Sequence, residues 1–168
     1  VGWRFYNFPS AVDLTWIEPD SFARDQSLFP VWKQMVDNLQ QGNDPLQEAV
    51  EITHAQQKKF VVSFRMNDIH YVDIEDFPTH NNFWRGNPQF RLGNATSRAA
   101  ALTDSGRVFN YLIPEVRDFY YRVLEEICTK YDIDGVELDF MRAPKFFYEK
   151  DTEMGRRVMT QHMERIRS

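Results

Sequence analysis

The sequence predicts an α/β fold of the (β/α) barrel type, of which this chain supplies about half. Helix-like and strand-like segments alternate, with short turns from helix to strand and long loops from strand to helix. One strand-like run, DGVELDFMR at 134–142, carries two carboxylates, and folds of this class keep their chemistry at the carboxyl ends of parallel strands. A closed barrel usually needs ~250 residues and about eight strands, whereas only three strand candidates appear here. Because both ends of the chain fall within patterned elements, we expect residues 1–168 to form a single α/β domain that is a fragment of a TIM barrel. The alternative is a small open α/β domain.

Composition excludes several classes of partner. The net charge is −5 and no cluster of Lys and Arg stands out, so we expect no nucleic-acid partner. No apolar stretch approaches the ~20 residues that cross a bilayer, so we expect no membrane partner. The N-terminus lacks the features of a signal peptide, which leaves the compartment open: a secreted or periplasmic protein fits if a signal was trimmed. Cys128 is the only cysteine and has the helical spacing of a core residue.

Aromatic residues make up 15% of the chain, more than a small core usually needs. A surface built for stacking against sugars is one explanation, and rings that fill the core are the other.

The first elements follow from local signals. Alternation predicts a strand over 2–8, and Pro and Asp punctuation predicts a loop over 10–25. A helix is expected from Pro30 to about Gly42, on an apolar stripe with helical spacing. Asp44 and Pro45 are suited to the N-cap and first position of a second helix.

The remaining elements alternate regularly. Residues 60–66 predict a strand, and 67–107 lack clear periodicity, which indicates a functional loop or elements hidden within it. Pro114 opens the most regular helix, which runs to Lys130, and a last helix begins at about Thr152.

Glu137 and Asp139 are the candidate catalytic pair. Strand alternation places both on one face, opposite Val136 and Leu138. Asp139 is the first choice because it lies nearest the carboxyl end of the strand, with Glu137 ~6.6 Å deeper. Arg65 falls on the corresponding face of the preceding strand, so it is expected to pair with one of these carboxylates. The alternative is a purely structural ion pair between Arg65 and Glu137.

Further residues are expected to line a substrate cleft. Asn67, Asp68 and His70 follow the strand at 60–66, where they could bind hydroxyl groups or supply a second carboxyl group; turn formation is the alternative, above all for Asn67. Arg142 could contact a carboxylate from the next loop. Rings of the long loop could stack on sugars or pack the loop against the barrel: Tyr71, Phe77, Phe83, Trp84 and Phe90. The histidines lack metal-site spacing, so no metal and no other cofactor is expected.

These segments resemble the glycosyl hydrolase-like proteins related to glycoside hydrolase family 10. The run at 134–142 carries most of the resemblance. FRMNDIH at 64–70 is similar to the end of their third barrel strand, and FNY at 109–111 with PEVR at 114–117 is similar to the lead into the helix before the fourth. The resemblance covers about 44–145. It implies a TIM barrel and a carbohydrate substrate, either hydrolysed by carboxylate acid and base chemistry or bound without catalysis. A homodimer or the rest of the barrel would then complete the fold.

A second resemblance is incomplete. YDIDGVELD at 131–139 is similar to the fourth strand of family 18 chitinases, whose motif places a catalytic Glu two residues after the last Asp. That position is Met141 here, which can neither donate nor accept a proton, so the chitinase mechanism is not expected.

Overall fold

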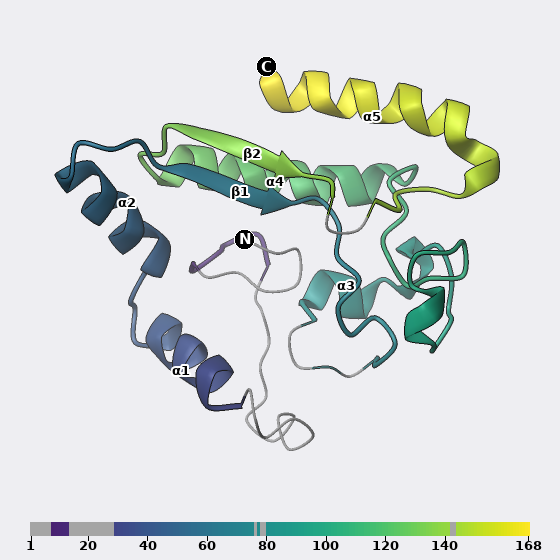
Figure 1. The fold of residues 1–168 in the computed structure, drawn as a ribbon, viewed down its shortest axis with the longest axis horizontal. Coiled ribbons are helices and arrows are strands. Elements are labelled where there is room, and N and C mark those ends of the chain that lie inside the picture. Colours follow the sequence, from purple (N-terminus) through teal and green to yellow (C-terminus); the bar gives the residue numbers. More distant parts are fainter. Residues whose placement is uncertain (1–7, 14–28, 76, 78–79, 142–143) are drawn as a thin grey trace.

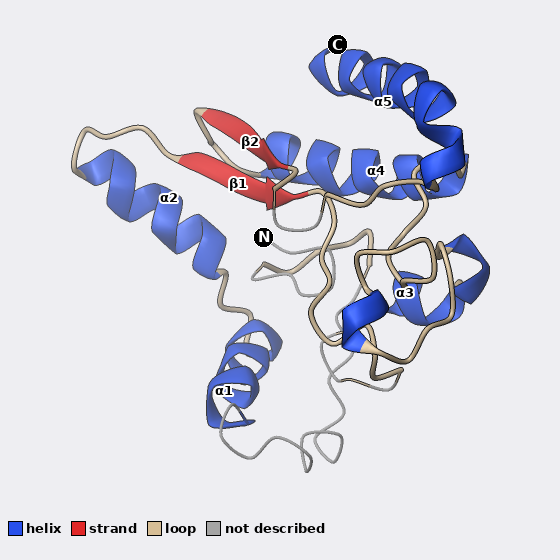
Figure 2. Cartoon of the chain, turned by 45° about the vertical axis from the view of Figure 1, so that its right-hand side comes forward, coloured by secondary structure: helices blue, strands red, loops and turns tan. Residues whose placement is uncertain are grey.

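The computed structural model describes residues 8–13, 29–75, 77, 80–141 and 144–168. A parallel pair of strands lies at its centre, with helices around it (Figures 1 and 2). The helices and strands, in chain order, are α1 Phe29–Gln40, α2 Pro45–Ala55, β1 Val61–Arg65, α3 Asn82–Gly86, α4 Pro114–Lys130, β2 Gly135–Asp139 and α5 Thr152–Arg167. The predicted order of helices and strands from residue 29 onward is confirmed. The predicted strand at 2–8 and most of the loop at 10–25 lie outside the described residues.

The start of α2 is formed by the residues that the sequence indicated. The Asp44 side chain accepts a hydrogen bond from the Gln47 backbone N–H at 3.2 Å, and Pro45 is the first helical residue. Leu46 and Val50 are buried on the inner face of the helix. Gly42, with a φ of 84°, lies between α1 and α2 in the left-handed region that glycine adopts without strain.

The two strands pair in parallel, and their alternation decides which side chains meet the core. Val62 and Phe64 of β1 are buried, whereas Val61 and Ser63 are exposed. In β2, Val136 and Leu138 pack against the core, while Glu137 is exposed. Helix α4 runs along the sheet and connects the two strands (Figure 1). The predicted faces of both strands are therefore confirmed.

Helix α4 supplies the largest part of the core. Its apolar stripe is buried at i, i+3, i+4 and i+7 spacing, as an amphipathic helix requires: Val116, Phe119, Tyr120, Val123, Leu124 and Ile127. Cys128 is exposed, so the prediction that it is a core residue is wrong. Because one helical residue turns by about 100°, Cys128 follows Ile127 just past the edge of the buried stripe.

Residues 67–107 contain the elements that periodicity did not reveal: α3 and two 3₁₀ turns, Pro88–Phe90 and Arg98–Ala100. The segment has a charged centre. Arg91, whose side chain is 1% exposed, pairs with Glu75 at 2.8 Å and stacks 3.5 Å above the Trp84 ring. Arg107 pairs with the same carboxylate at 2.9 Å. Helix α3 and the two 3₁₀ turns are too short to show a helical repeat in the sequence. Polar contacts hold this segment together.

At the amino ends of the strands, one carboxylate joins two turns. Asp134 accepts hydrogen bonds from the Phe60 backbone N–H at 2.7 Å and from His54 at 3.0 Å. These bonds lower the pKa of the Asp134 carboxyl group. The contact ties α2 to the turn before β2 and fixes where both strands begin.

Helix α5 packs alongside α4 and buries His162 (Figures 1 and 2). Among the described residues, neither nitrogen of the His162 ring has a hydrogen-bond partner. Burial, followed by the positive charges of Arg117 and Arg165, lowers its pKa from 6.5 to about 4, against the opposing effect of Asp118. The folded state therefore favours the neutral form of the His162 ring.

We expect the stability of the chain to fall with acidification because of His162. Below pH 6.5 the unfolded chain takes up a proton that the folded chain accepts only near pH 4, so the folded state loses up to about 3 kcal/mol across that window. The His162→Leu variant should lose this part of the pH dependence. Urea unfolding at pH 7.5 and pH 5 measures it, with the exposed Gln161→Leu as control. Equal pH dependence in His162→Leu and wild type would contradict the prediction.

Candidate functional site

The carboxyl ends of β1 and β2 lie side by side, and this brings most of the predicted site residues together. In the parallel register, Ser63 lies opposite Glu137 and Arg65 opposite Asp139. The Met66 backbone N–H donates to the Asp139 carbonyl at 3.0 Å and extends the ladder by one bond. Glu137 and Asp139 therefore share a face with Ser63 and Arg65, on the side of the sheet that α4 does not cover.

Asp139 is half-buried at the end of β2. Its Oδ1 accepts a hydrogen bond from the Met141 backbone N–H at 2.9 Å, which holds the carboxylate beside the turn that follows the strand. No ion pair reaches Asp139 from the described residues. The carboxylate is accessible in part and kept in place by backbone, an arrangement that suits a group which must act on a ligand.

Arg65 has a different partner from the one expected. Its guanidinium pairs with Asp68 at 3.3 Å, and within the described residues it makes no ion pair with Glu137 or Asp139. The prediction of a cross-strand pair, catalytic or structural, is thus wrong here. The reason is local, because β1 ends at Arg65 and the chain then turns, which brings the carboxylate three residues later within reach.

Asn67 connects two loops to the end of β1. It is 1% exposed, and its amide donates to the Lys145 carbonyl at 2.7 Å and to the Phe109 carbonyl at 3.4 Å. The end of β1 is thereby tied to the segment before α4 and to the segment after β2. Its burial and these hydrogen bonds give Asn67 a structural role.

Asp68 and His70 form a tight pair at the start of the long loop. Asp68 is 7% exposed. Its Oδ1 accepts hydrogen bonds from the backbone N–H of His70 at 2.9 Å and from His70 Nδ1. The His70 side chain is 37% exposed. A buried carboxylate thus orients an accessible imidazole.

One of the remaining predicted residues, Trp84, is buried away from any ligand, and another, Arg142, falls where the chain is not described. Trp84 is completely buried, and its Nε1 donates to the Arg107 carbonyl at 3.1 Å, so its ring packs the loop and cannot stack on a sugar. Of the other rings in the loop, Phe77 is buried and stacks at 3.7 Å on the half-buried Tyr71.

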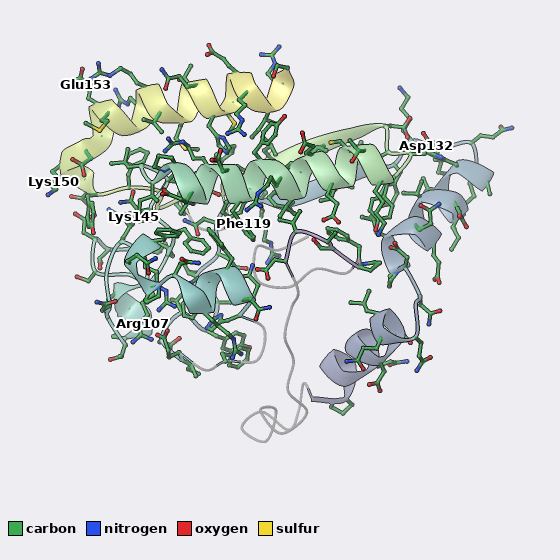
Figure 3. All side chains as sticks on the ribbon, turned by 180° about the vertical axis from the view of Figure 1, so that it is seen from behind. Arg107, Phe119, Asp132, Lys145, Lys150 and Glu153 are labelled. Carbon is green, nitrogen blue, oxygen red and sulfur yellow. The ribbon has the colours of Figure 1, made fainter. Side chains whose placement is uncertain are left out.

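Three features that support the site were not predicted from the sequence. The Tyr111 hydroxyl donates to the Met66 carbonyl. Tyr71 has a positive φ of 58°, unusual for a residue other than glycine. Lys145, labelled in Figure 3, pairs with Asp104 at 2.6 Å, and its hydrogen bond lowers the pKa of the Asp104 carboxyl group. Of these features, only Tyr111 had a signal in the sequence, because the FNY run at 109–111 is part of the family resemblance.

An apolar groove lies on the other face of β2. Its volume is about 620 Å³, and among its lining residues are Leu124 and Cys128 of α4, Val136 and Leu138 of β2 and Ile166 of α5. Because Val136 and Leu138 point away from Glu137 and Asp139, this groove is separate from the carboxylates.

Neither a metal site nor a membrane helix is found in the described part of the chain. No group of three or more His, Cys, Asp or Glu side chains there is arranged to hold a metal ion. None of the helices there has the length and apolarity needed to cross a bilayer.

One comparison with known proteins identifies the family of this chain. The family model described as glycosyl hydrolase-like 10 matches residues 15–165. The chain belongs to this family. A search of curated proteins gives no match. The glycosyl hydrolase-like 10 match spans both strands and ends within α5, so it includes the Asp139 and Asp68 segments together.

We expect Asn67→Asp to destabilise this glycosyl hydrolase-like 10 chain. The change replaces a donating amide by a carboxylate that faces the Lys145 and Phe109 carbonyls, and burying an unpaired charge of this kind costs about 2 kcal/mol or more. Thermal and urea unfolding measure the loss, with the exposed Asn94→Asp as the matched control. Equal stability of the two variants would show that Asn67 has no structural role.

Proposed function

We propose that this glycosyl hydrolase-like 10 chain hydrolyses glycosidic bonds in an oligosaccharide or polysaccharide, with Asp139 as the principal catalytic carboxylate. The observation that carries the proposal is the position of Asp139: half-buried, fixed by the Met141 backbone and beside Arg65 at the carboxyl end of a parallel strand. Family membership supports the substrate class. Glycoside hydrolysis needs an anionic group beside the anomeric carbon, as nucleophile, base or electrostatic stabiliser, together with a proton donor.

The proposal includes a barrel architecture. Adjacent parallel strands joined through a helix, with apolar side chains on the helix side and polar ones opposite, are the repeating unit of such a barrel. In that arrangement Ser63, Arg65, Glu137 and Asp139 face the interior, and the 67–107 loop lies at the mouth. This end of the strands is where barrel enzymes bind substrate.

Glu137 has a secondary role in this proposal. It is exposed on the strand, two residues from Asp139, and no described side chain holds it in an ion pair. A carboxylate without a fixed position contributes less to catalysis than one held by backbone. We therefore assign to Glu137 a contribution to the negative potential of the site.

Asp139→Asn should abolish turnover while binding is retained. The amide keeps the shape of the carboxylate but not its charge, so hydrolysis should fall by roughly 10²-fold or more, whereas the dissociation constant for the glycan should change little. Release of reducing ends from a panel of soluble polysaccharides measures turnover, and calorimetry measures binding. Glu137→Gln should reduce turnover by less than tenfold.

The matched control is Asp132→Asn, at the other end of α4 from Lys145 (Figure 3). Its side chain is 95% exposed, so turnover should stay at the wild-type level. If the wild type binds glycans and cleaves none of them, the chain is a carbohydrate-binding protein, and the catalytic proposal is wrong.

A further inference from the structure

The pair formed by Asp68 and His70 resembles the carboxylate and imidazole arrangement that enzymes use for proton transfer. When His70 Nδ1 donates to Asp68 Oδ1, the neutral ring carries its proton on Nδ1 and its basic lone pair on Nε2. The carboxylate fixes both the tautomer and the orientation of the ring. The second nitrogen is then the one that exchanges protons with a ligand.

The pair is held rigidly from three directions. Asp68 Oδ1 also accepts from the His70 backbone N–H, and its Oδ2 accepts from Arg65. On the other side of His70, the Tyr71 backbone is held at positive φ, and its carbonyl lies 3.1 Å from Nε2 of the buried His80. Residues other than glycine seldom adopt positive φ, and strained backbone of this kind clusters at functional sites.

The pair also lies on the same edge of the sheet as Asp139. Asp68 and His70 follow β1 by three and five residues, and β1 ends opposite Asp139. Arg65, the register partner of Asp139, contacts Asp68 directly. The segment that carries the imidazole therefore starts beside Asp139.

We infer that His70 is the general acid of the reaction and that Asp68 is its positioning residue. The inference rests on the proposed function. It assigns proton transfer to an imidazole in place of the second carboxyl group that glycosidases usually employ.

Protonated His70 donates its Nε2 proton to the glycosidic oxygen as the bond from that oxygen to the anomeric carbon breaks, and the electron pair of the bond stays on the oxygen. The Asp139 carboxylate stabilises the positive charge on the anomeric carbon. Water then adds to that carbon and gives a proton to His70 Nε2, which restores the imidazolium.

The leaving group of the substrate provides the decisive test. With an alkyl or sugar leaving group, His70→Gln should lower kcat/KM by roughly 10²-fold or more. A 2,4-dinitrophenyl glycoside of the same sugar departs without protonation, so with it the loss should be less than tenfold. A variant that merely disturbs the fold would lower both rates equally, and that result would overturn the assignment while leaving the hydrolase proposal intact.

His54→Gln is the matched control. His54 also contacts a carboxylate, at 3.0 Å from Asp134, but at the opposite end of the strands. Because this contact is structural and far from the strand ends that carry Asp139, any change in kcat/KM in His54→Gln should be the same for both substrates. A selective loss with the poor leaving group in His54→Gln would count against His70.

The positioning role of Asp68 has a readout that does not depend on activity. In ¹⁵N-labelled protein above neutral pH, two-bond proton–nitrogen correlation spectra should show His70 with its proton on Nδ1, and His70→Gln identifies the signal. Asp68→Ala should shift the ring toward the Nε2–H tautomer, and should reproduce the selective loss of His70→Gln with poor leaving groups. A His70 ring already in the Nε2–H form in the wild type would overturn the inference, whereas an absence of turnover with every glycoside would overturn the proposed function as well.

Discussion

The parallel register of β1 and β2 is the constraint on which the site depends. It sets Arg65 opposite Asp139 and aligns the two strand ends, so that the segments that follow them meet. Because side chains alternate along a strand, a slip of one residue would turn Glu137 and Asp139 toward α4 and expose Val136 and Leu138. The apolar contacts of Val62 and Phe64 with the core prevent this slip. The position of the carboxylates is therefore a consequence of hydrophobic burial on the opposite face.

Neutral hydrogen bonds to backbone, more than ion pairs, hold the site together. Asn67 reaches the Phe109 and Lys145 carbonyls, and Tyr111 reaches the Met66 carbonyl. These bonds join segments far apart in sequence, and they are buried, where an unmet donor or acceptor is costly. The ion pair of Arg65 with Asp68, by contrast, spans three residues. Long-range order comes from amides and hydroxyls, which leaves charged groups at the site for chemistry.

The sequence was sufficient for features governed by periodicity and insufficient for those governed by tertiary contacts. The bounds of α4 and the faces of β1 and β2 follow from apolar spacing and were predicted correctly. The partner of Arg65 was not, because a turn three residues away competes with the neighbouring strand and pattern alone cannot rank the two. For Trp84 the sequence left open whether the ring stacks on a sugar or packs the loop, because residue type does not reveal that the buried Arg91, paired with Glu75, lies over the ring. Nothing in residue type marks the left-handed backbone of Tyr71.

The segment between β1 and α4 has an interior of its own. Trp84, His80 and Arg91 are buried together there, and Arg85 donates to the Phe77 and His80 carbonyls at 3.1 Å. Such a segment keeps its shape through contacts internal to it. Insertions or substitutions on its outer surface can then accumulate without disturbing the strands, which makes this segment the part of the chain in which ligand preference can diverge during evolution while the strand ends stay unchanged.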